Sequence, residues 1–375
     1  MPTMLGRCGH HGVVPEPVRV AYTLEQCWHD VPGGTAVAAL QIGERLVRDS
    51  TVELIAVAGR HRLPPSEPWR PSFPVAALPI ARPWLYESWL RLGWPPVERA
   101  TGPVDVCHAT ALVPAPTRAP LVVTVHDLAF VRAPEAFTRH GVRVMRRSLD
   151  HIKRRADIVV CPSEATMADV AAAGVSSERL RLVPLGVDAT AASADEIDRV
   201  RARHDLPTDF VLFVGTIEPR KNVGRLALAI ARLDDPLPLV IAGVAGWGGV
   251  ADALSAAHVE ARFLGFVDEG DLPGLYAAAS VFAYPSLWEG FGLPVAEAMA
   301  QGTPVITSSG TSTAEVAGGA AVLVDPLDVD DIARGLSVAL RDRDRLRAAG
   351  RARAAALTWE AATAATRAVY AEVRR

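Results

Sequence analysis

Short runs of aliphatic and β-branched residues recur along the whole chain, with stretches of helical composition between many of them. The runs are apolar almost without interruption, whereas a strand with one solvated face alternates apolar and polar side chains. Strands of this kind that alternate with helices form βαβ units, so the sequence predicts an α/β protein with doubly wound parallel sheets. The strands are expected at 18–23, 52–59, 105–110, 121–127, 157–163, 180–186, 210–216, 237–243, 261–267, 280–286, 303–309 and 321–326.

A polar stretch at 186–209 contains no such run and divides the chain into two halves. A length of 375 residues is about twice that of a usual single domain, which also indicates two domains. Ligands of doubly wound domains bind outside the carboxyl ends of the strands, so we expect a ligand between the two domains. The predicted divisions are a flexible leader at 1–17, a first domain at 18–190, a linker at 191–208, a second domain at 209–356 and a terminal helix at 357–375.

The composition argues against several classes of protein. A net charge of −3 gives no general affinity for nucleic acid. No run of about 18 apolar residues is present, so no membrane-spanning helix is expected. The cysteines, Cys8, Cys27, Cys107 and Cys161, lack the spacing of a zinc site or a disulfide framework. We therefore expect a cytoplasmic protein without a metal site and without a nucleic-acid partner.

Two glutamates eight positions apart, Glu289 and Glu297, flank a glycine-rich turn in the second half. Pro294 is expected at the start of a helix, so the backbone N–H groups near Gly292 and Leu293 are free to bind an anion. A phosphate would repel the two carboxylates, which are therefore expected to accept hydrogen bonds from hydroxyl groups. A single glutamate at a helix start more often only favours the helix dipole. A nucleotide sugar supplies phosphates and hydroxyls together, and it explains the pair.

Two adjacent cations, Arg220 and Lys221, lie in the segment GTIEPRKN that follows the first strand of the second half. Fixed positive charge at a strand end suits a diphosphate, since it can neutralise a leaving phosphate without a metal. An isolated Arg–Lys pair is more often a solvated loop. The acidic run at 328–331 resembles a metal-binding DxD sequence, but Asp at a helix start is ordinary and we expect it to cap a helix.

The segment GTIEPRKN, with PSLWEGFGLPVAEAMAQGTPVITSS later in the same half, resembles the retaining glycosyltransferases of family 4. That family has the GT-B fold and includes many bacterial mannosyltransferases. The first-half segments at 31–40, 105–116, 122–137 and 180–188 are similar to the family too. The resemblance covers most of the chain and implies two Rossmann-like domains that face each other across a cleft.

The resemblance also implies which residues bind the donor, a nucleotide-diphosphate sugar. Glu289 would bind the sugar hydroxyls, Glu297 the ribose hydroxyls and Lys221 the diphosphate. Many relatives carry Arg after the glycine of the first loop, where this chain has Thr216, and Arg220 is expected to replace it. The other residues expected at the donor are Gly33, Gly34, Gly215, Thr216, Gly290, Phe291, Gly292 and Leu293.

On the acceptor side, the resemblance implies that His126 faces the transferring sugar and the acceptor. Asp127 and His108 are expected near the acceptor, although a histidine at a strand end is by itself more often structural. The residues expected to take part in catalysis are His126, Lys221, Arg220 and Glu289.

The reaction implied for the family retains the anomeric configuration and occurs on one face of the sugar. The departing diphosphate helps to deprotonate the incoming hydroxyl, so the protein orients the reactants and stabilises the leaving group. No cofactor and no metal are expected. GDP-mannose is the favoured donor, because the loop GTIEPRKN is similar to that of mannosyltransferases, and UDP-sugars remain open. The acceptor is expected to be a glycan, a lipid-linked compound or a small molecule with a hydroxyl group.

Other functions are weighed against transfer. A two-domain NAD enzyme would need the pattern G-x-G-x-x-G directly after a first strand, and neither half has it there. A nucleotide-sugar epimerase and a non-catalytic nucleotide-sugar-binding protein of the same fold both stay open as alternatives.

Three segments have a marked apolar or basic face. The segment 82–96 contains tryptophans at helical spacing, and 139–155 is strongly basic. Such faces more often pack on a core or stay solvated, but together they leave open a peripheral contact with the inner face of a membrane. The segment 357–375 is expected to form one helix that crosses back onto the first domain.

Overall fold

The computed structural model describes residues 16–30, 32–244, 254 and 257–374, and the strands of these residues form two parallel sheets. The first sheet has the strand order β3-β2-β1-β4-β5-β6-β7, and the second has the order β10-β9-β8-β11-β12-β13. β1 and β8, the first strands of the two halves, each lie in the interior of their sheet, and later strands are added on both sides of them. This doubly wound order confirms the predicted α/β class.

The strands occur where the apolar runs predict them. β3 was not predicted, because its short apolar run at 75–78 lies between Pro74 and Pro79, and proline argues against a strand. The bounds are β1 (Val18–Thr23), β2 (Val52–Ala58), β3 (Val75–Ala77), β4 (Val106–Ala109), β5 (Leu121–Thr124), β6 (Ile158–Cys161), β7 (Leu180–Leu182), β8 (Val211–Val214), β9 (Leu239–Ala242), β10 (Ala261–Gly265), β11 (Val281–Tyr284), β12 (Val305–Ser308) and β13 (Val322–Val324).

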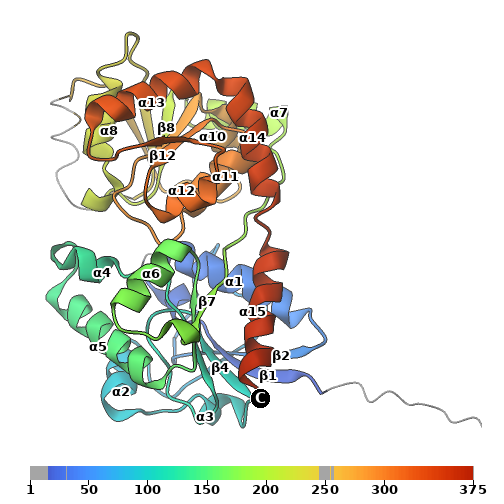
Figure 1. Cartoon of the computed structure of the whole chain (residues 1–375). Coiled ribbons are helices and arrows are strands. Elements are labelled where there is room, and N and C mark those ends of the chain that lie inside the picture. Colours follow the sequence, from blue (N-terminus) through green and yellow to red (C-terminus); the bar gives the residue numbers. More distant parts are fainter. Residues whose placement is uncertain (1–15, 31, 245–253, 255–256, 375) are drawn as a thin grey trace, which may run out of the picture.

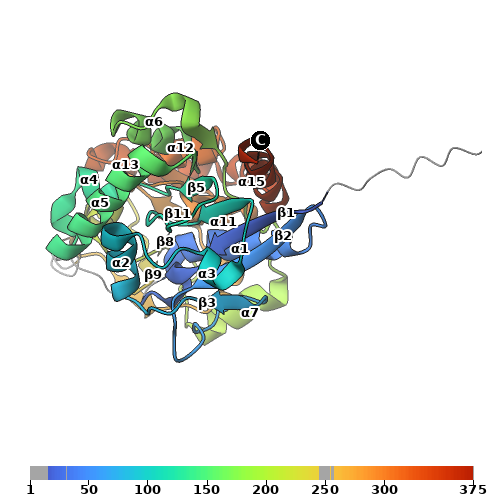
Figure 2. The ribbon, with the colours of Figure 1, turned by 90° about the horizontal axis from the view of Figure 1, so that it is seen from below.

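The first sheet and the helices that cover it form the lower half of the molecule in Figure 1. Viewed from below, in Figure 2, α2 and α3 are nearest the reader. The helices of this half are α1 (Gly33–Val47), α2 (Trp84–Leu92), α3 (Glu98–Thr101), α4 (Ala129–Arg132), α5 (Arg139–Arg155) and α6 (Glu164–Ala172), with 3-10 turns η1 (Glu25–Trp28), η2 (Pro134–Ala136) and η3 (Ser177–Arg179).

The upper half of Figure 1 holds the second sheet and its helices. The segment expected as a linker, 191–208, contains α7 (Ala194–Arg203), which begins with a Ser193–Glu196 capping box and packs on α10 (Leu272–Ala278). The other elements of this half are η4 (Pro219–Lys221), α8 (Val223–Ile230), α11 (Leu293–Ala300), α12 (Ser312–Ala317), α13 (Val329–Arg341) and α14 (Arg343–Ala355). The last helix, α15 (Trp359–Val373), lies in the lower half.

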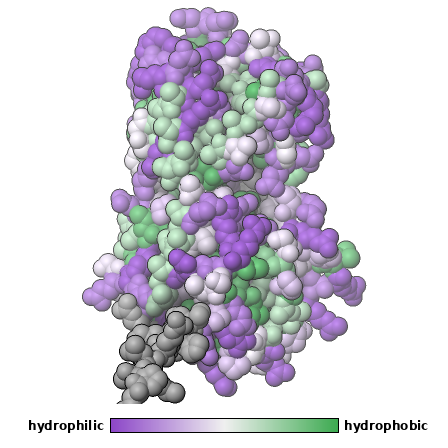
Figure 3. Space-filling model, turned by 90° about the vertical axis from the view of Figure 1, so that its right-hand side faces the viewer, coloured by the Kyte–Doolittle hydropathy of each residue, from purple (hydrophilic) through white to green (hydrophobic). Residues whose placement is uncertain are grey.

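Two chain segments connect the halves, and they lie side by side. The N–H of Val187 donates to the carbonyl of Leu357 at 2.9 Å, and a Cβ on Gly186 would lie 2.2 Å from the nitrogen of Trp359. After this crossing, α15 packs against α1 of the first domain (Figure 1). The surface narrows where the two domains meet, on the face that Figure 3 shows.

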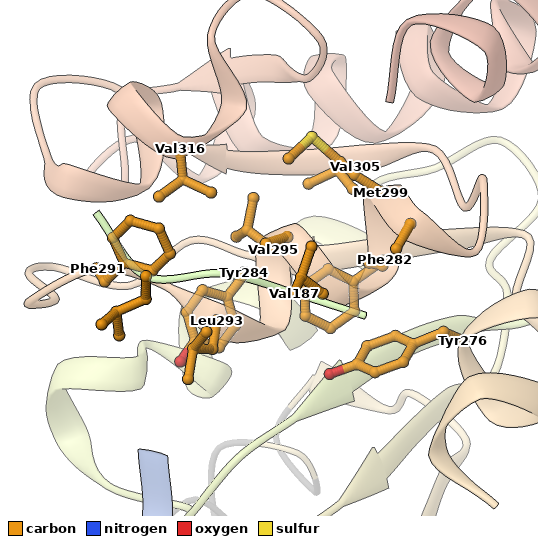
Figure 4. Packing of buried hydrophobic residues seen from close by; sticks show 14 of the residues in the cluster. Val187, Tyr276, Phe282, Tyr284, Phe291, Leu293, Val295, Met299, Val305 and Val316 are labelled. Carbon is orange, nitrogen blue, oxygen red and sulfur yellow. The ribbon is translucent and has the colours of Figure 1, made fainter. Parts of the chain in front are cut away.

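The second sheet is held to its helices by a buried cluster that surrounds α11 (Figure 4). The ring of Phe282 stacks with the ring of Tyr284, with 5.7 Å between the ring centroids. It meets the ring of Tyr276 edge-on, with 5.4 Å between the centroids. Both tyrosines place an apolar ring in the core and keep a hydroxyl group for a polar partner. The packing therefore fixes two hydroxyl groups beside the segment that carries Glu289 and Glu297.

The apolar stripe expected at 82–96 is partly buried. Leu85 and Trp89 are in the core of the first domain, whereas Leu92 is 77% exposed. Trp84 and Trp94 are exposed as well. No helix among the described residues combines the length and the apolar character that crossing a bilayer requires. The predicted leader lies, up to residue 15, outside the described residues.

Candidate active site

The carboxylate of Glu289 lies between the two cations of the loop from β8 to α8. Its Oε1 accepts from Lys221 Nζ at 2.6 Å, and its Oε2 accepts from Arg220 Nη1 at 2.6 Å. All three side chains are largely withdrawn from solvent. Arg220 also pairs with Glu218 at 2.7 Å. Lys221 donates a second bond to the Tyr284 hydroxyl, so one of its three N–H groups stays available.

This cluster keeps Glu289 ionised. Burial alone would raise the pKa of its carboxyl, but the charges of Lys221 and Arg220 outweigh burial and lower the pKa to about 2. A buried carboxylate between two hydrogen-bonded cations is fixed in position, because losing either partner leaves a buried charge uncompensated. Glu289 thus offers a rigid acceptor for hydrogen bonds, and the cations offer a fixed positive charge.

The loop that carries the cations is shaped by Asn222, which the sequence analysis did not single out. Asn222 has a left-handed backbone with φ of +62°, a conformation that Asn tolerates better than most residues. Its Nδ2 donates to the carbonyls of Pro285 at 3.0 Å and Pro326 at 2.6 Å. The N–H of Leu287 donates to the carbonyl of Arg220 at 2.8 Å. These bonds tie the two loops of the site together.

Gly290, next to Glu289, touches the first domain. A Cβ at this position would lie 1.9 Å from the carbonyl oxygen of His126, so only glycine permits this approach. The carbonyl of Gly290 accepts from the hydroxyls of Ser163 at 2.6 Å and Thr166 at 3.0 Å. Residues at the start of α6 therefore hold the loop between β11 and α11 against the end of β5.

A second contact between the domains lies at the same N-terminal end of α6. The carboxylate of Glu315, on α12, accepts from the backbone N–H groups of Glu164 and Ala165 at 2.8 Å each. These are free N–H groups at a helix N-terminus, where a negative charge is stabilised. The carboxylate of one domain thus caps a helix of the other.

Glu297 lies in the first turns of α11, whose N-terminus follows Gly292. Its Oε2 accepts from the Tyr276 hydroxyl at 2.7 Å, and burial raises the pKa of its carboxyl. Glu297 lines an interdomain cavity of about 350 Å³, to which both domains contribute. Other residues around this cavity are Gly33, Val37, Trp69, Phe266, Glu269, Leu272, Tyr276 and Leu293.

Gly33 and Gly34 begin α1, with Gly33 in a left-handed conformation at φ of +61°. A Cβ on Gly34 would come within 3.3 Å of the Leu293 side chain, so the first turns of α1 and α11 approach each other across the domains. Gly33 thus lines the same cavity as Leu293 and Glu297, and Gly34 lies beside Leu293. Gly215 directly follows β8 and has φ of +144°, and Thr216 beside it is half-buried.

His126 follows β5 and borders a different cavity. Its Nε2 bonds to the carbonyl oxygen of Thr110 at 3.2 Å. A carbonyl can only accept, so Nε2 carries the proton and Nδ1 of the neutral ring is an acceptor. Burial lowers the pKa of His126, which favours this neutral form. Asp127 lies at the same cavity and accepts from the N–H of Ala129 at 3.0 Å.

His108 is buried in the first domain and bonded within the protein at both ring nitrogens, so the expectation that it lies near the acceptor stays a prediction. The ring is 2% exposed, with Nδ1 bonded to the Tyr370 hydroxyl at 2.6 Å and Nε2 bonded to Thr124 Oγ1 at 2.8 Å. Burial lowers its pKa to about 3, so the ring is neutral. His108 fastens α15 to the first sheet.

The acidic run at 328–331 caps a helix, as expected. The side chain of Asp328 accepts from the N–H groups of Asp330 and Asp331 at the start of α13. Within the described ranges, no three His, Cys, Asp or Glu side chains gather as a metal site would require. Cys27, Cys107 and Cys161 are buried free thiols.

Comparison with known proteins identifies the family. The family model Glycosyltransferase Family 4 matches residues 32–191, and Glycosyl transferases group 1 matches residues 195–355. O-antigen chain mannosyltransferase B of Escherichia coli is 35% identical over 268 residues, which are 65% of this chain and 68% of that protein. Serotype-specific mannosyltransferase WbdA of Escherichia coli is 32% identical over 223 residues, which are 55% of this chain but only 27% of that protein.

The fold has relatives of known structure. The crystal structure of Anabaena Alr3699/HepE in complex with UDP and glucose has a TM-score of 0.71 at 19% identity, and the match covers 95% of this chain and 100% of that one. At that identity the likeness concerns the fold alone, and it agrees with the GT-B arrangement of two Rossmann-like domains. Together with the two family models and the mannosyltransferase match, it shows that this chain belongs to glycosyltransferase family 4, among the glycosyl transferases of group 1.

Proposed function

We propose that this protein is a retaining glycosyltransferase that moves mannose from GDP-mannose to a hydroxyl group of an acceptor in glycan or glycoconjugate synthesis. The observation that carries the proposal is the buried cluster of Glu289, Lys221 and Arg220, which lies across the domain contact from His126. It combines a fixed hydrogen-bond acceptor for sugar hydroxyls with fixed positive charge for a diphosphate.

The relatives support the sugar of the proposed donor, since the proteins of Escherichia coli that match this chain are named as mannosyltransferases. The HepE structure contains UDP and glucose, so it supports a nucleoside diphosphate in this fold, and the choice of GDP rests on the loop GTIEPRKN alone. The interdomain cavity lined by Glu297 would take the nucleoside, with the carboxylate accepting from ribose hydroxyls. Its volume of about 350 Å³ falls in the range of roughly 300–1,000 Å³ that is usual for ligand pockets.

In the proposed reaction, the bond between the anomeric carbon and the diphosphate oxygen breaks, and its electron pair leaves with the diphosphate. The acceptor oxygen forms the new bond to the anomeric carbon on the same face of the sugar. Its proton passes to an oxygen of the departing diphosphate. Lys221 and Arg220 stabilise the charge that develops on this leaving group, and Glu289 orients the sugar.

His126 is proposed to contact the sugar through its Nδ1. Because this nitrogen accepts in the neutral ring, it can bind a sugar hydroxyl but cannot donate to the leaving group. Metal independence, the absence of a cofactor, the cytoplasmic location and a peripheral membrane contact all stay predictions.

Titration of the purified protein by calorimetry, without added metal, tests the nucleotide. GDP, UDP, ADP and NAD are compared, and we expect GDP to bind most tightly. Tightest binding of UDP would change the donor series, and binding of NAD alone would contradict the proposal.

A transfer assay then tests the chemistry. GDP-mannose labelled in the sugar is incubated with methyl and octyl α-D-mannoside, and the anomeric configuration of the product is determined by NMR. Formation of an α-linked product supports retention, and a β-linked product would contradict it. Isomerised donor without transfer would favour an epimerase, and GDP binding without turnover would favour a non-catalytic binding protein.

A further inference from the structure

The cavity beside His126 differs in character from the rest of the cleft. This first-domain cavity has a volume of about 470 Å³, within the range of roughly 300–1,000 Å³ that is usual for ligand pockets. His126 and Asp127 lie at it, where β5 ends, and α2, α4 and α5 contribute to its sides. A molecule in this cavity would therefore reach the place where transfer is proposed to occur.

Most of the cavity wall is apolar. The apolar side chains come from the loop after β4, from α4 and the turn after it, and from α5. They are Leu112, Val113, Phe130, Phe137, Val144 and Met145. An unsubstituted sugar would leave hydroxyl groups without partners against such a wall, whereas an alkyl or aryl group would be favoured by its removal from water.

Several polar groups of the same cavity are engaged in hydrogen bonds within the protein. Gln26 Nε2 donates to Thr110 Oγ1 at 2.6 Å, and His29 Nε2 bonds to the Tyr86 hydroxyl at 3.0 Å. These groups have satisfied part of their hydrogen-bonding capacity within the protein. Glu87 lines the cavity as well; its Oε2 pairs with Arg91 at 2.7 Å and Arg147 at 3.3 Å, whereas its buried Oε1 accepts no hydrogen bond. The free hydrogen-bonding atoms of the cavity thus include this oxygen besides those of His126 and Asp127.

Arg82 also lines this cavity. Its side chain is half-buried at this cavity, and none of the ion pairs among residues 16–30, 32–244, 254 and 257–374 includes it. A charged side chain withdrawn from water usually has a partner. The guanidinium is planar and has five donors, which suit a phosphate or a carboxylate. An anionic group on the ligand would supply the missing partner.

We propose that the acceptor carries an apolar group and an anionic group, that the first-domain cavity binds the apolar group, and that Arg82 binds the anion. This proposal rests on the proposed transfer function, and it gives the acceptor a chemical class. The reacting hydroxyl would lie at the His126 end of the cavity.

Binding of octyl phosphate tests the proposal without knowledge of the acceptor sugar. The full chain is first saturated with GDP, which occupies the cations at Lys221 and keeps phosphate away from them. Octyl phosphate, below its micelle concentration, and inorganic phosphate are then titrated separately by calorimetry. We expect octyl phosphate to bind at one site and at least tenfold more tightly than inorganic phosphate. Equal affinities, or no binding of octyl phosphate at millimolar concentration, would overturn the proposal.

Substitutions locate the bound probe. Met145→Gln should weaken octyl phosphate at least fivefold, and Arg82→Gln at least tenfold. Val142→Gln is the matched control, because Val142 is on the same helix but does not line the cavity. Leu112→Gln is a second cavity variant in case Met145→Gln does not fold. Wild-type affinity in Arg82→Gln, or an equal loss in Val142→Gln, would contradict the assignment.

The two proposals fail in different ways. If GDP does not bind, the proposed function is in doubt. If GDP binds and octyl phosphate does not, the transfer function stands and only the class of acceptor is wrong. The transfer assay adds a check, since octyl α-D-mannoside should have a KM at least tenfold lower than methyl α-D-mannoside. Equal KM values would overturn the apolar part of the proposal.

Discussion

The two sides of the cleft differ in polarity. On the second domain, Lys221 and Arg220 enclose the Glu289 carboxylate in a buried cluster of paired charges. On the first domain, the cavity next to His126 has mainly apolar walls and contains Arg82, which forms no ion pair with any residue that the structure describes. A buried charge tolerates little displacement from its partner, whereas an apolar wall accepts different groups of suitable shape. The comparison indicates strict recognition of the donor and looser recognition of the acceptor.

The largest effect is expected on the charged side, from Lys221→Met. This change removes a cation from the proposed leaving-group site and leaves Glu289 with one partner fewer. Loss of one preorganised charge donor typically costs about 10²–10³-fold in kcat. We expect a loss of that size in the transfer assay, with folding checked by thermal melting.

Lys153→Met is the matched control, because Lys153 and Lys221 are the only lysines of the chain. Lys153 lies on α5 near Asp150, at 3.9 Å, and does not line the cavity next to His126. Its replacement should leave transfer unchanged. A similar loss in both variants, or activity retained in Lys221→Met, would remove the distinction between the two sides of the cleft.

The two sides also differ in how far the sequence predicts them. Arg220 and Lys221 are adjacent, and Glu289 and Glu297 share one short segment, so the donor side is visible as local motifs. The cavity next to His126 is assembled from residues that are scattered along the first half of the chain, and no single short segment contains them. The lining residues are at positions 26, 29, 35, 82, 83, 86, 87, 111–113, 126, 127, 130, 137, 140, 141, 144 and 145.

Other misses have the same physical cause. Tyr284 and Asn222 position Lys221 and its loop, but a buried tyrosine and a loop asparagine give no signal until the fold brings their partners near. The partner of His108, Tyr370, is 262 residues away in the chain. The strands, in contrast, follow from local apolar runs, and among the described strands β3 alone was not predicted. Local patterns predict elements and motifs, whereas contacts distant in sequence need the fold.

The contact between the two sides is tested by Gly290→Ala. The added Cβ would lie 1.9 Å from the His126 carbonyl, so the domains have to move apart or the loop has to shift. A displacement of about 1 Å can cost on the order of 10²-fold in rate. We expect kcat to fall about 30-fold to 100-fold while GDP still binds. Gly270→Ala is the control, because its Cβ meets nothing within 4 Å. Unchanged kcat in Gly290→Ala would show that transfer does not need this contact.

A smaller effect is expected from Glu315→Ala, which removes the carboxylate that caps α6 from the other domain. Hydrogen bonds to charged groups contribute about 1.5–3 kcal/mol, and solvent reduces this for a half-buried side chain. We expect kcat/KM to fall about tenfold, and Glu315→Gln to recover part of it because the amide oxygen can still accept. An equal loss in both variants would show that the charge matters more than the hydrogen bonds.

The smallest effect is expected from a change of pH, which tests whether the titratable groups of the site change their charge. The pKa of Glu289 is about 2, so its carboxylate stays ionised at neutral and alkaline pH. Burial lowers the pKa of His126, which keeps the ring neutral above its ordinary pKa of about 6.5. Neither group should therefore change its charge between pH 7 and 8.5.

We expect the Kd of GDP-mannose to change less than twofold over this range. GDP-mannose is the proper probe, because the terminal phosphate of GDP has a pKa near 6, as phosphate monoesters do, and would add a titration of its own. Burial also lowers the pKa of Lys221, but the ionised Glu289 at 2.6 Å opposes this and should keep the ammonium charged. Affinity that falls toward pH 8.5 in the wild type, but not in Lys221→Met, would show that burial prevails. The cluster would then carry less positive charge than its geometry implies.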